Sequence, residues 1–157
     1  MSTHDAGTHA AHGDAHSNLA DFINHHGVDT QWQREFYEHM HAYPELSGEE
    51  QETAGFIQDK LREFDCEVIT HIGGHGIVAL FHNGEGPTVL FRADFDGLPV
   101  QEATGVPFAS KNEGQMHACG HDMHTTALLG LCQILNESRD RWQGTFIALF
   151  QPAEETA

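Results

Sequence analysis

Apolar residues in this 157-residue chain change their spacing several times after residue 30. Segments with the three-to-four-residue period of an amphipathic or buried helix begin near residues 30, 47 and 121. Short runs of β-type residues lie between and after them, at 66–72, 77–82, 88–92 and 145–150. Because helices alternate with buried strands, the sequence predicts an α/β sandwich.

Local signals predict where individual elements begin and end. Either Asp29 or Thr30 can cap the first helix, and Pro44 ends it. Ser47 and Glu50 have the Ser-x-x-Glu spacing of a capping box at the start of the second helix. The nearly continuous apolar run at 88–92 predicts a central strand that is covered on both faces.

Residues 1–18 differ in composition from the rest of the chain. They contain His4, His9, His12 and His16 without a hydrophobic period, which predicts a disordered, His-rich tail. The alternative is a tail that binds a transition metal loosely, although the spacing of its histidines fixes no geometry.

Charge and cysteine content exclude several classes of protein. With 24 acidic against 7 basic residues and a net charge of -17, the surface repels nucleic acid and anionic membranes, so we expect neither as a partner. The acidity fits either ordinary cytosolic solubility or a salty habitat. The odd set Cys66, Cys119 and Cys132 and the lack of a signal-peptide pattern indicate a cytoplasmic protein.

Three polar clusters each lie after a predicted strand or before a helix, at residues 92–99, 116–124 and 151–155. Open α/β sheets hold their sites at the carboxyl ends of strands, so we expect these clusters to meet at one edge of the sheet. There they would share ions about 3.5–4 Å apart. The side chains expected to converge are Asp94, Cys119, His121, Glu154 and Glu155.

The second cluster has the composition of a metal site. It holds three histidines, one cysteine and one aspartate, and these ligand types suit zinc, manganese or cobalt. Gly120 lets the backbone fold so that Cys119 and His121 face one point. The alternative is a capped helix start with a buried structural cysteine. Cys66 and Cys132 have apolar neighbours and are expected in the core.

Glu154 and Glu155 point in different directions because they are adjacent in the sequence. One carboxylate can therefore bind a metal while the other faces a bound water. Metal-assisted hydrolysis requires this division of labour, with the free carboxylate transferring the proton. An ordinary solvated turn is the alternative.

Four segments occur in a fixed order between about residue 30 and the end of the chain. They are His41-Ala-Tyr-Pro-Glu-Leu46 with Glu50 and Thr53, Arg92-Ala-Asp-Phe-Asp-Gly-Leu-Pro99, Met116-His-Ala-Cys-Gly-His-Asp122, and Phe150-Gln-Pro-Ala-Glu-Glu155. Together they resemble the aminoacylase and carboxypeptidase metallopeptidases. The resemblance is strongest to the amidohydrolase branch that includes hippurate hydrolase, indole-acetyl-amino-acid hydrolase and N-acetyl-diaminopimelate deacetylase.

The resemblance implies a three-layer, zinc-exopeptidase-like α/β catalytic domain with a mixed β-sheet. It implies a metal-dependent enzyme that hydrolyses the amide bond of N-acyl amino acids or small peptides. The implied cofactors are two divalent metal ions, zinc or manganese, with cobalt or nickel as alternatives.

The resemblance also implies roles for individual residues. Cys119 bridges or binds metal, and His121 binds one ion. Glu155 binds the other ion and Glu154 is the general base, although the order of these two roles stays open. The acidic motif contributes a carboxylate that orients a ligand or the base, and the residues that match it are Asp94 and Asp96.

Members of this family have longer chains, two further histidine ligands downstream and a smaller domain that closes the cleft and usually makes the dimer. We therefore expect residues 19–157 to be the amino-terminal part of a truncated catalytic domain. The parent enzyme is expected to be a homo-oligomer that acts on a small molecule. The competing hypothesis is a catalytically silent metal-binding or interaction fragment.

Overall fold

The computed structural model describes residues 30–156, so the predicted tail at residues 1–18 lies outside the described residues. The elements are, in order, α2 (Thr30–Ala42), α3 (Gln51–Leu61), β1 (Glu67–Ile72), β2 (Gly76–Asn83), β3 (Thr88–Asp94), α4 (His121–Glu137), η1 (Arg139–Arg141), β4 (Gly144–Gln151) and η2 (Glu154–Thr156). The predicted helices and strands are all found, with small shifts at their ends. No helix of the described part is both long and apolar enough to cross a membrane.

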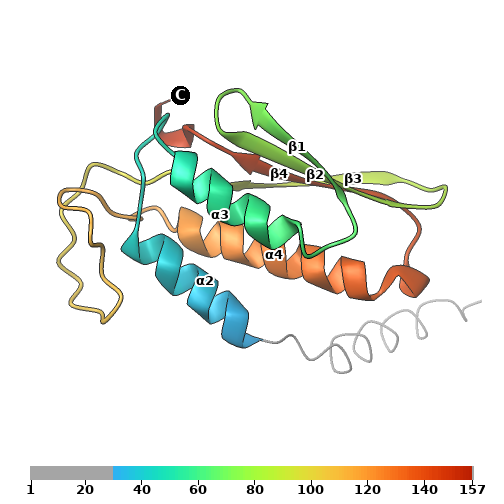
Figure 1. Cartoon of the computed structure of the whole chain (residues 1–157), viewed down its shortest axis with the longest axis horizontal. Helices are drawn as coiled ribbons and strands as arrows, with labels where there is room; N and C mark the ends of the chain where they lie inside the picture. Colours follow the sequence, from blue (N-terminus) through green and yellow to red (C-terminus); the bar gives the residue numbers. More distant parts are fainter. Residues whose placement is uncertain (1–29, 157) are drawn as a thin grey trace, which may run out of the picture.

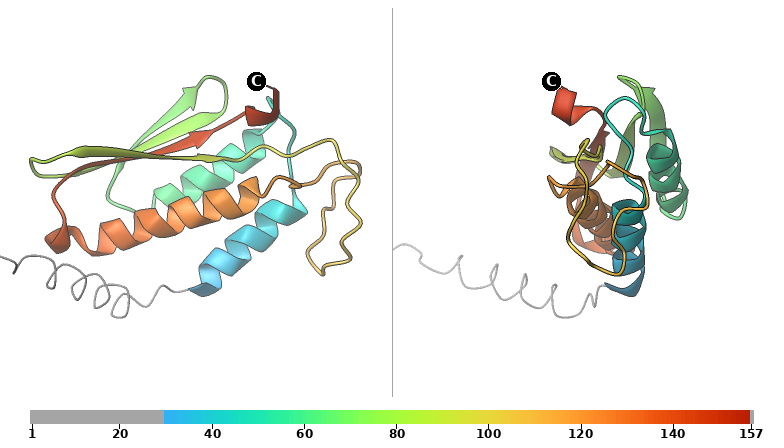
Figure 2. Two further views of the ribbon diagram at one scale, coloured as in Figure 1. Left: turned by 180° about the vertical axis from the view of Figure 1, so that it is seen from behind. Right: turned by 90° about the vertical axis from the view of Figure 1, so that its left-hand side faces the viewer.

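The strands form one mixed sheet in the order β1-β2-β4-β3. The pairs β1–β2 and β2–β4 are antiparallel, and β3 runs parallel to β4. The predicted α/β class with a mixed sheet is confirmed. The helices α2, α3 and α4 lie on one side of this sheet (Figures 1 and 2). On the other side, residues 30–156 place no α-helix.

The core lies between the sheet and the three helices. Alternate residues of β2 and β4 point inward, because successive side chains of a strand face opposite sides of a sheet. The buried set on these strands is Ile77, Ala79, Phe81, Phe146, Ala148 and Phe150. Their partners in the same core include Met40, Ile57, Leu61, Leu128, Leu129 and Cys132 from the helices. This packing holds the start of α4 beside the ends of β3 and β4.

The prediction that residues 88–92 form a central, doubly covered strand is wrong for the described part of the chain. β3 is an edge strand of the four-stranded sheet. Val89, Leu90 and Phe91 are 50%, 53% and 56% exposed, and only Ala93 is buried. An apolar run indicates that its residues favour burial, but it does not indicate which strand or helix packs beside them.

The predicted capping box at the start of α3 is also wrong. The helix has no side-chain cap from its N-cap residue, Glu50. The carboxylate of Glu45 instead accepts hydrogen bonds from the backbone N–H groups of Glu52 (3.2 Å) and Thr53 (2.7 Å). The side chains of Ser47 and Glu50 make tertiary hydrogen bonds, to Asp96 and to the backbone of Ala153.

Candidate metal centre

The candidate centre lies where the carboxyl ends of two parallel strands meet the start of α4. The last residues of β3 and β4, Asp94 and Gln151, are paired across the sheet. The hydroxyl of Thr125 on the first turns of α4 donates to the carbonyl oxygen of Asp94 at 2.9 Å. In Figure 1 the start of α4 and the red η2 lie at the same end of the molecule.

Three predicted ligands are close enough to share an ion. One ligand atom from each of Cys119, His121 and Glu155 lies within 4.8 Å of the others. The Oε1 atom of Glu155 is buried and has no hydrogen-bond partner among the described residues. A buried carboxylate oxygen without a partner is costly unless another group binds it. This orphaned oxygen, with a thiol and an imidazole beside it, fits a divalent cation.

The hydrogen bonds of His121 orient its ring for metal binding. Its Nδ1 lies 3.0 Å from the carbonyl oxygen of Asp96 and 3.1 Å from the Oδ1 atom of the same residue. Both are acceptors, so in the neutral ring Nδ1–H donates and Nε2 keeps its lone pair. Nε2 lies 3.8 Å from Glu154 Oε2 and 4.0 Å from Glu155 Oε1. Histidine ligands of metal sites commonly donate their other ring N–H to a carboxylate or carbonyl in this way.

The sequence assigned Asp94 and Asp96 the same possible role, but the two residues have different surroundings in the structure. Asp96 is 1% exposed, and its Oδ2 accepts hydrogen bonds from the hydroxyl of Ser47 (2.7 Å) and the N–H of Glu155 (3.0 Å). Burial alone would raise the pKa of Asp96, but these hydrogen bonds lower it overall, so the group is ionised. Asp94 instead accepts a hydrogen bond from Arg92 at 2.7 Å.

Negative charge accumulates around Cys119, which is exposed. The nearby carboxylate of Glu155 raises the pKa of the Cys119 thiol most, and partial desolvation and the other neighbouring carboxylates raise it further. In these surroundings the thiolate is disfavoured, and a bound cation would reverse that preference. The charge balance therefore also favours a cation at this point.

The remaining polar residues of the 116–124 cluster lie outside the group of three. His117 is 4% exposed, and neither of its ring nitrogens has a partner among the described residues. Burial lowers the pKa of His117 to about 4, so its ring is neutral at pH 7. Asp122 turns away toward α2, and the ring centroid of His124 lies 5.9 Å from that of His121. Among the predicted core cysteines, Cys132 is fully buried, and Cys66 packs against the core with its thiol pKa raised to about 11 by burial.

Sequence reasoning missed a buried ionic cluster beside the centre. The Nδ1 atom of His41 lies 2.6 Å from Asp122 Oδ2, and its Nε2 lies 3.2 Å from Glu102 Oε1. Burial alone would lower the pKa of His41, but the hydrogen bonds to both carboxylates raise it overall. The available sequence signal was that His41 opens the first motif of the resemblance.

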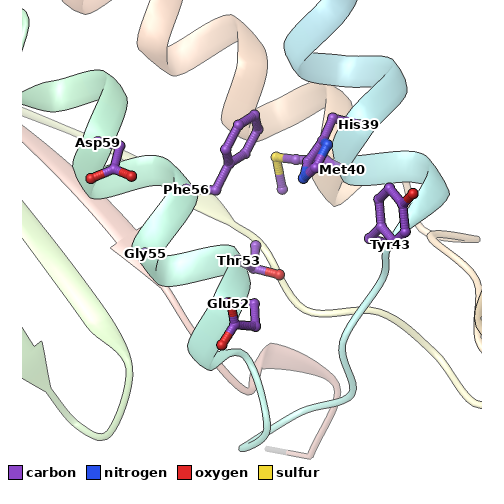
Figure 3. Close-up of a pocket in the computed structure, with 8 residues that line it drawn as sticks. All are labelled: His39, Met40, Tyr43, Glu52, Thr53, Gly55, Phe56 and Asp59. Atoms are coloured by element: carbon purple, nitrogen blue, oxygen red, sulfur yellow. The ribbon is translucent and has the colours of Figure 1, made fainter.

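A separate hollow of about 280 Å³ lies between α2 and α3 (Figure 3). Figure 3 shows side chains from both helices around it. Its lining residues are His39, Met40, Tyr43, Glu52, Thr53, Gly55, Phe56 and Asp59. None of the predicted site residues lines this hollow, so we do not assign it a part in the candidate chemistry.

Comparisons with known proteins agree with the resemblance. Residues 90–157 match the model of peptidase family M20/M25/M40. The N-acetyl-L-cysteine deacetylase of Bacillus subtilis (strain 168) is 49% identical over 118 residues, which are 74% of this chain and 28% of that protein. The N-acyl-L-amino acid amidohydrolase of Geobacillus stearothermophilus is 44% identical over 125 residues, 79% of this chain and 33% of that protein.

A solved structure of the same family also resembles this chain in fold. The crystal structure of the Bacillus subtilis YXEP protein, described as a dinuclear metal binding peptidase from the M20 family, matches with a TM-score of 0.75 and 41% identity. The match covers 79% of this chain and 35% of that chain. The chain therefore spans about a third of the length of the relatives that it matches.

Proposed function

We propose that this chain, which is similar to peptidase family M20/M25/M40, carries part of the metal centre of an amidohydrolase. The parent enzyme hydrolyses the amide bond of N-acyl amino acids or small peptides. The observation that carries the proposal is the approach of Cys119, His121 and Glu155 to within 4.8 Å, with Glu154 next to them. The names of two relatives, which specify N-acetyl-L-cysteine and N-acyl-L-amino acids, support this class of substrate.

The residues of this chain would hold two divalent ions together with ligands from the rest of the parent enzyme. His121 would bind one ion through Nε2, Glu155 would bind the other, and Cys119 would bridge them or bind one. When bound, the ions polarise the amide carbonyl and lower the pKa of a water molecule. Thiolate and imidazole favour zinc, while carboxylate also accepts manganese, so we propose one of these two metals.

Glu154 is the residue placed to transfer a proton. Its side chain is 37% exposed, with Oε2 3.8 Å from His121 Nε2. Its carboxylate takes a proton as the water oxygen bonds to the carbonyl carbon. It returns the proton to the leaving nitrogen as the C–N bond breaks, which yields a carboxylic acid and an amine; the acid then passes its remaining proton to the amine, giving a carboxylate and an ammonium ion. Asp96 holds the ring of His121 and the backbone of Glu155 during these steps.

We also propose that residues 19–157 are the amino-terminal part of the catalytic domain, and that the parent enzyme is a cytoplasmic homo-oligomer. The relatives' length supports the first statement, since this chain covers only 28% and 33% of two of them. The three free cysteines support a reducing compartment.

Metal analysis and an activity assay test the proposal together. The parent enzyme, purified with metal, should contain about two ions per chain and hydrolyse N-acetyl or N-benzoyl amino acids. A chelator should abolish turnover, and zinc or manganese should restore it. A parent enzyme that holds metal but hydrolyses none of these substrates would favour the competing hypothesis of a silent metal-binding protein.

A further inference from the structure

Glu50 is a buried carboxylate that the proposed chemistry does not use. It stands at the amino end of α3 and is 0% exposed. Its Oε1 accepts a hydrogen bond from the backbone N–H of Ala153 at 2.7 Å, across 103 residues of sequence. Its Oε2 is buried without a hydrogen-bond partner among the described residues. Such a group is expensive to bury and contributes little to packing, so stability of the core does not explain its presence.

The residue that Glu50 holds has an uncommon backbone conformation. Ala153 has a φ of 53°, in the left-handed region that residues with a Cβ seldom adopt. It comes directly before Glu154, so its φ and ψ set the direction in which the Glu154–Glu155 pair leaves β4. Strained backbone of this kind persists only where neighbouring groups hold it in place.

A second carboxylate holds the other end of the same turn. The N–H of Glu155 donates to Asp96 at 3.0 Å, and Asp96 is held by the hydroxyl of Ser47 at 2.7 Å. Ser47 and Glu50 therefore lie three residues apart in one segment and support both ends of the turn 153–155. Ser47 acts through Asp96, whereas Glu50 makes its contact directly.

We propose that Glu50 is a positioning residue, which sets the direction of the proton-transfer and metal-binding carboxylates by holding the Ala153 N–H. This inference rests on the proposed function of Glu154 and Glu155. Loss of the hydrogen bond frees the first residue of the turn and lets both carboxylates move relative to His121. A displacement of about 1 Å at reacting groups is enough to slow an enzyme strongly.

Three variants of the metal-loaded parent enzyme test this role. E50L removes the acceptor but keeps an apolar side chain of similar size. E50Q keeps a carbonyl oxygen for the Ala153 N–H. E49L, at the exposed neighbouring position, is the matched control. The measurements are kcat, KM, the melting temperature, and the absorption spectrum of the Co²⁺-substituted protein, which reports ligand geometry without turnover.

We expect E50L to lower kcat by about tenfold or more with KM nearly unchanged, and to alter the Co²⁺ spectrum. Its melting temperature should stay close to that of the unmodified enzyme, because the loss of the hydrogen bond from Ala153 is offset by the removal of a carboxylate oxygen that is buried without a partner. E50Q should recover most of the lost kcat, and E49L should match the unmodified enzyme in every measurement.

Two results would overturn the role of Glu50 while leaving the proposed function intact. One is an E50L enzyme with the kcat and Co²⁺ spectrum of E49L. The other is a fall in kcat that E50Q shares equally and that follows a fall in melting temperature, which is the pattern of a purely structural residue. If the unmodified parent enzyme neither binds Co²⁺ nor hydrolyses N-acyl amino acids, the proposed function fails, and this inference fails with it.

Discussion

The middle of β3 and the residues just after its carboxyl end contrast sharply. Asp96, two residues after the end of β3, is 1% exposed and hydrogen-bonds to groups from three other segments. In the middle of β3, Val89, Leu90 and Phe91 are each at least 50% exposed. Polar side chains are usually outside and apolar ones inside, so the two regions depart from the rule in opposite directions.

The contrast separates two kinds of functional surface. The buried polar groups at the carboxyl end are paired with one another, except for a few atoms such as Glu155 Oε1. That combination fits the cation site that we propose. The middle of β3 borders an apolar hollow of about 300 Å³ that Leu131, Leu135 and Trp142 also line. That combination marks a surface left uncovered by residues 30–156.

The largest effect is expected from breaking the buried ion pairs of His41, beside the candidate centre. His41→Phe keeps an aromatic ring beside Tyr37 and Phe108 but leaves the carboxylates of Asp122 and Glu102 buried without their shared partner. We expect a loss of about 3–5 kcal/mol in the free energy of unfolding, measured by urea denaturation. His39→Phe on the same helix is the control, since that exposed ring contacts the ring of Phe56 instead of a carboxylate.

The loss in His41→Phe should depend on pH in a direction that the pKa shift fixes. The pKa of His41 is raised in the folded state from its ordinary 6.5, so the folded protein binds this proton more tightly than the unfolded chain. The contribution of His41 is full below pH 6.5 and is lost as pH rises through its folded pKa. A difference between variant and unmodified protein that grows from pH 6 to 9 would contradict this assignment.

The next largest effect concerns the carboxylate pair in the parent enzyme. Glu154→Gln keeps the shape of the side chain but removes the base, so kcat should fall on the order of a hundredfold or more while metal content is retained. Glu155→Gln should weaken metal binding instead, because it replaces a charged ligand with a neutral oxygen. Metal loss in the Glu154 variant alone would reverse the two roles. Unchanged turnover in both variants would indicate that Glu154 and Glu155 belong to an ordinary solvated turn.

A smaller effect is expected for the reactivity of Cys119. Without metal, Glu155 and the other nearby carboxylates keep the pKa of the thiol above its ordinary 9.0, so alkylation should be slow near pH 7 and quicken as pH rises. Bound metal should slow alkylation further, on the order of tenfold, by occupying the thiolate. The rates are measured in a chain with Cys66 and Cys132 replaced by alanine. Equal alkylation rates with and without chelator would show that Cys119 is not a metal ligand.

The smallest effect is expected in the middle of β3. Leu90→Lys places a charge at a residue that is already 53% exposed, so the free energy of unfolding should change by no more than about 0.5 kcal/mol. The variant should self-associate no more than the unmodified 157-residue chain, because a lysine on an edge strand opposes pairing with another strand. A loss above about 2 kcal/mol in urea denaturation would show that Leu90 is covered in solution and would remove the contrast.

Much of the fold was predictable because it depends on local spacing. The helical period placed α3 and α4, and the turn residues separated β1 from β2. The position of Cys119 beside His121 also follows from local sequence, since Gly120 between them adopts a φ of 83°. Whether these residues bind metal stays a prediction.

Only the tertiary structure decided which polar side chains meet. His41 reaches Asp122 across 81 residues, and Glu50 reaches Ala153 across 103. It also set Asp96, rather than Asp94, against His121. The exposure of β3 was likewise invisible in its apolar run, because strand order decides which strand is at the edge. The spacing of apolar residues shows which face of a helix or strand is apolar. The partners of a buried carboxylate depend instead on which elements pack around it.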